Sequence, residues 1–230
     1  MLDLGLIVGA NMSHGLIVQP FSPFNLNEEK PKYTSDGFGI QAGALINFYI
    51  TSEIEICLEP MYAQSKLQLV YENGAIPGFE DNSGDLTPDH SENQSYLYIP
   101  LTGTYEMAFG NFRPYARLGG MLGLMLTDKT STSQGIFQGP DEDNMDNRRP
   151  LNYWVVGGLG AKYKLSKGYF YLDARYNFGL NRYLSSGDER YTQENHNWVY
   201  MYQDSDFRVN STMVSFGYVR SFYNPKRIGN

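Results

Sequence analysis

The sequence predicts an all-β fold: an eight-stranded antiparallel up-and-down transmembrane β-barrel, formed as a single domain over residues 1–230. Three observations support this prediction. Eight segments alternate apolar and polar side chains, as strands with two distinct faces do. The connections between these segments alternate strictly between long and short. Charged residues and most strand glycines share one face, while apolar residues occupy the other.

The connections fall into two length classes. Residues 51–53, 108–111 and 165–168 are three or four residues long, which is typical of hairpin turns. The others exceed twenty residues, and a meander with this order places them all at one end, as in bacterial outer-membrane barrels with short periplasmic turns and long extracellular loops. The predicted strands are 2–11, 37–50, 54–63, 95–107, 112–125, 152–164, 169–181 and 210–222, followed by a short periplasmic tail at 223–230. The long extracellular loops are 12–36, 64–94, 126–151 and 182–209.

The composition excludes several classes of protein. A net charge of −7 argues against nucleic-acid binding, which requires a basic surface. The longest apolar run, Leu118–Leu126, is shorter than the roughly 20 residues of a membrane-spanning helix. The single cysteine, Cys57, cannot form an internal disulfide. Because strand-like sequence follows Met1 directly, we expect the sequence of a mature, exported form.

The two strand faces could be assigned in two ways. A soluble lipocalin-like barrel would place the apolar face inside, whereas a membrane barrel places it against lipid. The glycines on the charged face and its balance of five acidic and five basic residues favour a crowded lumen with paired ions, and hence the membrane barrel. The predicted lipid-facing residues include Leu97, Ile99, Leu101, Leu118, Leu172 and Phe216. The predicted lumen ion-pair network, which has a structural role, contains Glu55, Glu59, Arg113, Arg117, Lys162, Asp173 and Arg175.

Aromatic side chains collect near the predicted strand ends, as in the interfacial girdles of membrane barrels. The general preference of aromatic residues for strands is the alternative explanation. The short-turn end has Phe48, Tyr49, Phe109, Phe112, Tyr163, Tyr169, Phe222 and Tyr223. The long-loop end has Tyr62, Tyr96, Tyr153 and Trp154.

Six short motifs follow one another along the predicted strands. They are Leu58-Glu59-Pro60-x-Tyr62, the run Tyr96–Leu101, Arg113-Pro114-Tyr115 with Gly119-Gly120, Gly158-x-Gly160-x-x-Tyr163, Arg175-Tyr176-x-x-Gly179-Leu180 and Ser215-Phe216-Gly217-Tyr218. In this order they resemble the PorT-like outer-membrane β-barrel family of Bacteroidota-type bacteria. The resemblance covers all eight predicted strands and none of the loops. It departs from the family at Tyr98, where many members have an inward-facing acid.

The resemblance implies an eight-stranded barrel in the cell outer membrane, and no catalytic residues carry over from the family. We expect no cofactor. The name-giving member of the family serves a protein-secretion apparatus. We therefore expect a non-enzymatic protein, a structural or binding accessory subunit of a larger outer-membrane complex for secretion or uptake. Its partners would be the lipid bilayer and other outer-membrane proteins. A narrow pore for small solutes or ions and a surface-loop enzyme are the alternatives.

The long loops contain the candidates for other chemistry. His14, His90 and His196, with Ser13, Asp89 and Asp188 nearby, could form a dispersed catalytic set, although no pair has catalytic or metal-ligand spacing. The carboxylates between Asp141 and Asp146 could chelate calcium. Since this segment lacks the glycine and terminal glutamate of a helix-loop-helix calcium site, a solvated acidic loop is the simpler interpretation. No catalytic residue and no resident metal is predicted.

Overall fold

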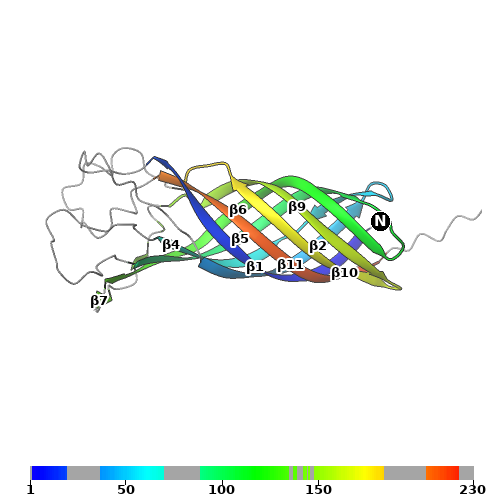
Figure 1. Ribbon diagram of the computed structural model, residues 1–230, viewed down its shortest axis with the longest axis horizontal. Coiled ribbons are helices and arrows are strands. Elements are labelled where there is room, and N and C mark those ends of the chain that lie inside the picture. Colours follow the sequence, from blue (N-terminus) through cyan, green and yellow to red (C-terminus); the bar gives the residue numbers. More distant parts are fainter. Residues whose placement is uncertain are drawn as a thin grey trace, which may run out of the picture.

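The computed structural model describes residues 2–19, 37–69, 89–134, 137–138, 142–143, 145, 148–183 and 206–222. Its strands close into an elongated barrel in which each strand is antiparallel to both neighbours (Figure 1). Around the ring the order is β1, β2, β3 with β4, β5, β6, β9, β10, β11 and again β1. The long strands are β1 (Leu2–Gln19), β2 (Gly37–Tyr49), β3 (Ile54–Leu58), β4 (Met61–Leu69), β5 (Asp89–Glu106), β6 (Phe112–Gln134), β9 (Leu151–Leu165), β10 (Gly168–Gly179) and β11 (Asp206–Ser221). Two-residue strands β7 (Phe137–Gln138) and β8 (Glu142–Asp143) pair with the far end of β6.

Strands β3 and β4 act as one wall strand, so the ring has the eight strands that the sequence predicts. Both keep the same register against β2 and against β5. The interruption falls at Glu59 and Pro60, because proline has no N–H for the ladder. The backbone stays connected there, since the Pro60 carbonyl accepts a hydrogen bond from the N–H of Ala44 at 3.0 Å.

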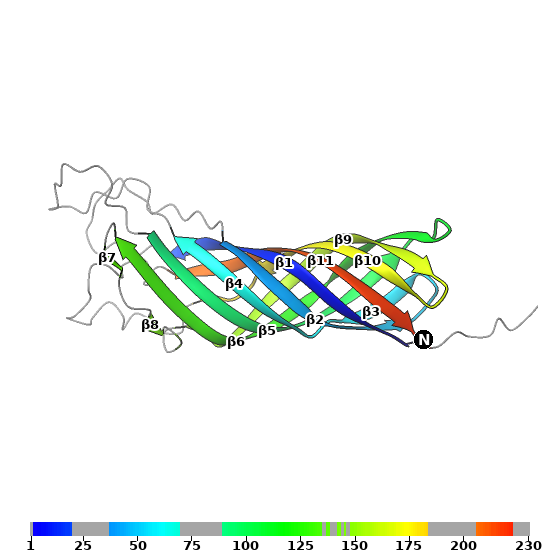
Figure 2. The same ribbon diagram turned by 90° about the horizontal axis from the view of Figure 1, so that it is seen from below.

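The short turns lie at the end of the barrel where β1 starts and β11 ends (Figure 2). There Asp3 pairs with Ser221. In the turn before β3, the Thr51 hydroxyl accepts hydrogen bonds from the N–H groups of Glu53 and Ile54. In the turn before β6, Gly110 has a φ of 65°, a conformation that favours glycine. We call this the lower end of the barrel and the opposite end the upper end.

The predicted limits of the long loops are wrong at the upper end. Strand β1 continues to Gln19 paired with β11, and β5 and β6 remain paired as far as Asp89 and Ser133. His14 and His90 therefore lie in β1 and β5 rather than in loops. On β5 and β6 the sequence hides these extensions because residues 89–95 and 127–133 are polar on both faces. The tail 223–230, His196 and Asp188 lie outside the described residues.

Apolar side chains cover the outside of the barrel, and Leu118 is 69% and Leu172 56% exposed. All six residues predicted to face lipid point outward: Leu97, Ile99, Leu101, Leu118, Leu172 and Phe216. The predicted aromatic girdles are partly wrong, since Tyr96, Trp154 and Tyr169 are buried in the lumen. The described residues include no helix long and apolar enough to span a membrane.

Candidate functional site

The inward side chains of β5 and β6 show how the lumen is layered. From the lower end upward, β5 presents Glu106, Thr104 and Thr102, then Tyr98 and Tyr96, and finally Gln94 and Glu92, all buried. The lumen thus contains two polar layers separated by an aromatic one.

Four side chains in the lower half form a closed ring of ion pairs. Arg117 contacts Glu59 at 2.6 Å and Asp173 at 3.0 Å, and Arg175 contacts the same two carboxylates at 2.5 and 2.7 Å. All four side chains are at most 2% exposed. The ring has two charges of each sign, which meets the requirement that ions buried away from water be paired.

A second group of ion pairs lies nearer the lower rim. The Lys162 ammonium contacts Glu55 at 2.5 Å and Glu106 at 3.0 Å, and Glu106 also pairs with Arg113 at 2.6 Å. Lys164 lies 3.9 Å from Glu106 and is one-third exposed at the rim. We call the two groups together the lower network. It contains all seven residues that the sequence assigned to lumen pairing, Glu55, Glu59, Arg113, Arg117, Lys162, Asp173 and Arg175, with Glu106 and Lys164 added.

Tyrosines join the two groups of the lower network. The Tyr115 hydroxyl donates a hydrogen bond to Asp173 at 2.9 Å, and its ring lies 5.3 Å from the Arg117 guanidinium and 5.5 Å from the Lys162 ammonium. Lys162 also lies 5.1 Å from the Tyr169 ring centroid. A Cβ at Gly160 would collide with the Tyr115 ring, so glycine makes room for this tyrosine. Large and small side chains therefore fill the narrow lumen together.

The middle layer consists of three aromatic rings packed against one another. Tyr96 and Tyr98 lie parallel with centroids 5.0 Å apart, and the Trp154 ring meets Tyr98 edge-on at 5.4 Å. The Trp154 indole donates a hydrogen bond to the Val209 carbonyl at 2.7 Å, which fixes the ring across the lumen. A Cβ at Gly123 would lie 2.5 Å from the Trp154 ring. Tyr98 contributes to this layer at the position where the resembling family often carries an acid.

The upper layer holds a group of ions that the sequence analysis missed. Arg148 contacts Glu92 at 2.5 Å and Asp128 at 3.0 Å, and all three side chains are fully buried. We call these residues the upper triad. The Tyr183 hydroxyl donates to Asp128 at 3.3 Å, and the Tyr183 ring lies 5.0 Å from the Arg148 guanidinium. Arg148 thus lies between two carboxylates and an aromatic face.

Asp128 was missed because the sequence analysis assigned it to a loop, and a β-bulge in the continuing strand β6 sets its direction. The β5–β6 register shifts between Ser95 and Tyr96, so that β6 holds an extra residue near Leu126 and Thr127. Both of these side chains point outward, and Asp128 turns inward as a result. Strict alternation from Met125 would have turned Asp128 outward. Arg148 lies just before β9, where the Arg149 N–H donates to the Tyr183 carbonyl at 2.9 Å.

The upper triad lies above the apolar belt. The outward neighbours of its strand residues are polar, namely Asn93 on β5 and Thr127 and Lys129 on β6. Burial, and next the nearby Glu92 carboxylate, raise the pKa of Asp128 above its ordinary range, although the Arg148 guanidinium opposes that rise. Two carboxylates share one guanidinium here, so the triad is neutral only when one carboxylate holds a proton.

The remaining candidate groups do not assemble into a reactive site in the described part of the chain. No group of three metal-ligating side chains occurs there. Asp141 and Asp146 of the possible calcium segment lie outside that part. Ser13 is within hydrogen-bond distance of Ser65 at 2.5 Å. The thiol of Cys57 is buried and donates a hydrogen bond to Glu59 at 3.1 Å.

A family model decides the classification. The model of the outer membrane protein beta-barrel domain matches residues 1–185. The chain belongs to that family. The barrel accordingly resides in the cell outer membrane, where its apolar outside contacts the lipid bilayer. The match is to this broad family, and it names no narrower group.

Solved outer-membrane barrels resemble this family member over nearly their whole length. Neisserial surface protein A is 12% identical, with 95% of this chain and 97% of that chain covered and a TM-score of 0.46. OprG from Pseudomonas aeruginosa is 14% identical, with 94% and 95% covered and a TM-score of 0.43. Ail from Yersinia pestis is 16% identical, with 95% and 98% covered and a TM-score of 0.40. Comparison with the curated proteins found no match.

Proposed function

We propose that the protein is a non-enzymatic, non-conducting PorT-like barrel that serves as a structural or binding accessory subunit of a larger outer-membrane complex for secretion or uptake. The observation that carries this proposal is the filling of the lumen. Along β5 and β6 the inward side chains above the lower rim are buried or lie beside a glycine, and Arg113 at the rim is the partly exposed one. A barrel filled in this way offers its outer wall and its upper strand extensions for interaction.

Charge pairing supports the absence of conduction. A pore for ions or small solutes needs a water-filled path lined by polar groups. Here the charged groups of the lower network contact one another at 2.5 to 3.9 Å, and Tyr96, Tyr98 and Trp154 lie across the lumen above them. The ion pairs therefore have a structural role in this proposal.

The ordered strand motifs support the accessory role. All six place residues in the described lumen or wall, including Glu59, Arg113 and Arg175. The same motifs carry the resemblance to the PorT-like family, in which the name-giving member serves a secretion apparatus. Paired strands that extend above the apolar belt, such as β4, β5 and β6, provide a surface on the outer side.

Affinity isolation tests the accessory role. The tagged barrel would be extracted from native outer membranes in mild detergent and its companions identified by mass spectrometry, with an unrelated tagged eight-stranded barrel as the control. We expect the same outer-membrane or periplasmic proteins in repeated isolations, and their loss when the upper extension of β4 and β5 is shortened. Repeated recovery of the barrel alone would overturn the accessory role without affecting the closed lumen.

A further inference from the structure

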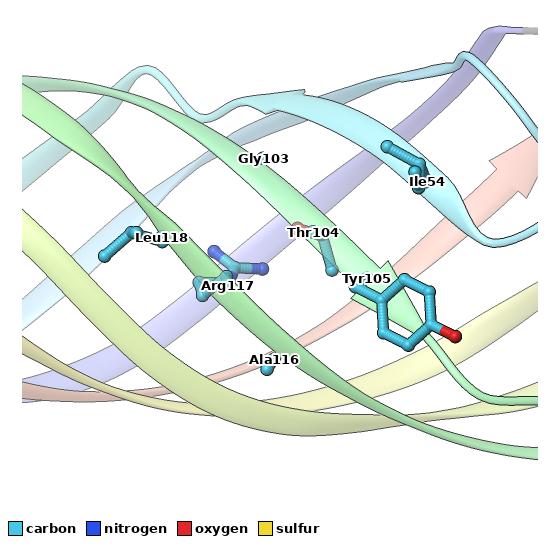
Figure 3. Close-up of a pocket in the computed structure, with 7 residues that line it drawn as sticks. All are labelled: Ile54, Gly103, Thr104, Tyr105, Ala116, Arg117 and Leu118. Carbon is cyan, nitrogen blue, oxygen red and sulfur yellow. The ribbon is translucent and has the colours of Figure 1, made fainter.

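A groove of about 340 Å³ opens on the outer wall of the barrel, where β3, β5 and β6 run side by side. In Figure 3, Leu118 stands on one side of the groove and Ile54 and Tyr105 stand on the other, with Gly103 and Ala116 between them. The lining residues are Ile54, Gly103, Thr104, Tyr105, Ala116, Arg117 and Leu118.

The groove exists because small residues alternate with large ones on this part of the wall. Gly103 has no side chain, and a Cβ built on it would meet only the Leu118 carbonyl oxygen, at 3.8 Å. Ala116 on the next strand contributes one methyl group. The side chains of Leu118 and Tyr105 are more than half exposed and project beyond this floor. Thr104 and Arg117 are buried, with Arg117 paired inside the lumen, so the groove itself is apolar.

The position of the groove places it in one leaflet. Ala116 lies four residues after Phe112, where β6 begins next to the short turn. With a rise of about 3.3 Å per residue and a tilt of about 45°, this is roughly 10 Å above the lower rim. Short turns are periplasmic in bacterial outer-membrane barrels, so the groove faces the inner leaflet. Tyr105 stands at its lower border, where tyrosine can place its hydroxyl near lipid headgroups.

We propose that this groove is a binding site for an acyl chain of a diacyl phospholipid of the inner leaflet. The groove is continuous with the wall that contacts the bilayer, so hydrocarbon is the surrounding medium. An acyl chain held between Leu118 and Tyr105 fills the space between these projecting side chains, which would otherwise stay open.

The shape of the groove favours an acyl chain over a protein segment. A transmembrane helix of a partner is about 10 Å wide with its side chains. Such a helix would rest on the projecting Leu118 and Tyr105 side chains and leave the floor at Gly103 empty. A single acyl chain is thin enough to reach that floor. This inference does not depend on the proposed accessory role.

Native mass spectrometry of the barrel released from phosphatidylethanolamine nanodiscs tests the proposal. We expect the wild-type barrel to retain one phospholipid at a collision energy that removes all other bound lipids. Gly103→Leu fills the groove and should lose that phospholipid. Gly157→Leu is the matched control, because Gly157 does not line the groove and a Cβ there meets nothing within 4 Å. Heat-dependent gel mobility verifies that both variants fold.

Equal retention by the two variants, or none by the wild type, would overturn the proposal. A second measurement uses phosphatidylethanolamine with a photoreactive acyl chain, and maps the adducts by mass. We expect adducts at Gly103–Tyr105 and Ala116–Leu118 in nanodiscs and in native outer membranes alike. Labelling that is uniform over the wall would contradict a specific site. If the groove residues are labelled in nanodiscs but not in native membranes, a protein covers the groove in the native membrane. That result would overturn the proposed lipid site.

Discussion

The lower network and the upper triad both place arginine between two carboxylates, but in different surroundings. In the lower network, Arg117 and Arg175 share Glu59 and Asp173, and every partner lies on or beside a strand within the apolar belt. In the upper triad, Arg148 comes from the segment before β9, and its partners lie on strand extensions above the belt. Similar ion-pair chemistry therefore has two effects: it stabilises the wall at membrane depth, and it attaches a loop segment to the upper end.

The charge balance also differs between the two. Four charges of the lower ring cancel, whereas the triad has one acid in excess and a carboxyl group with a raised pKa, that of Asp128. A group of ion pairs whose charges cancel keeps its stability when the pH changes. A group with an extra carboxyl group takes up or releases a proton, so its stability depends on pH.

Arg117→Met should have the largest effect. It leaves Glu59 and Asp173 each with a single cationic partner, Arg175, inside the membrane, and removing one member of a buried ion pair destabilises by about 3–5 kcal/mol. Denaturant unfolding in micelles, followed by tryptophan fluorescence, measures the loss. The buried thiol of Cys57 gives a local readout, because it donates to Glu59 and should react faster with a maleimide in the variant.

Arg220→Met is the matched control, since Arg220 is exposed on the outside of β11. We expect it to leave both the unfolding midpoint and the Cys57 reaction rate unchanged. Equal behaviour of the two variants would show that the lower ring contributes nothing to stability.

Arg148→Met should open the upper end without unfolding the barrel. The variant leaves buried carboxylates unsatisfied, which costs about 1–3 kcal/mol, and Asp128 can limit this cost by taking up a proton. We expect amide exchange in residues 89–95 and 127–134 to quicken by about tenfold to a hundredfold, with exchange in β10 unchanged. Hydrogen exchange read by mass spectrometry separates the two regions. Uniform acceleration in all strands would contradict a local role.

The upper end should loosen as the pH rises. The folded protein holds the Asp128 proton to a higher pH than the unfolded chain does, so the folded state binds more protons above the ordinary pKa of 3.8. The stability contributed by this proton is present at low pH and is lost as pH rises through the raised pKa. Hydrogen exchange in 127–134 should therefore, after correction for the intrinsic rate, quicken between about pH 4 and pH 7. Asp128→Asn should abolish this dependence, and a dependence retained in that variant would assign it to another group.

Lys164→Met should have the smallest effect. Lys164 is one-third exposed at the lower rim and lies 3.9 Å from Glu106, which keeps Arg113 and Lys162 as closer partners. Exposed ion pairs contribute about 0–1 kcal/mol. The midpoint of denaturant unfolding should shift by less than it does for Arg117→Met. A shift of equal size would mean that the outer partners of the lower network matter as much as its buried ring.

The contrast between the two regions also explains what the sequence could reveal. Alternation and loop lengths were enough to predict eight strands, and inward charges such as Glu59 and Arg117 follow from strand parity alone. Parity was not applied at Asp128, because residues 126–151 were predicted as a loop; β6 in fact continues there, and a bulge near Leu126 reverses its faces. Trp154 was predicted as a girdle residue because it lies near a strand end, although alternation with the outward Val155 directs its ring into the lumen, where Gly123 leaves room for it. Contacts between segments far apart in the chain, such as that of Arg148 with Glu92, leave no pattern in the neighbouring sequence from which they could be predicted.

The most direct test of the closed lumen is conductance of the purified, refolded barrel in planar bilayers. The two polar layers and the aromatic rings between them predict a silent bilayer for the wild type at physiological salt. Arg117→Met and Arg148→Met should also remain silent singly, because Tyr96, Tyr98 and Trp154 still cross the lumen in each. Reproducible unitary currents from the wild-type barrel would contradict the account and support a narrow pore.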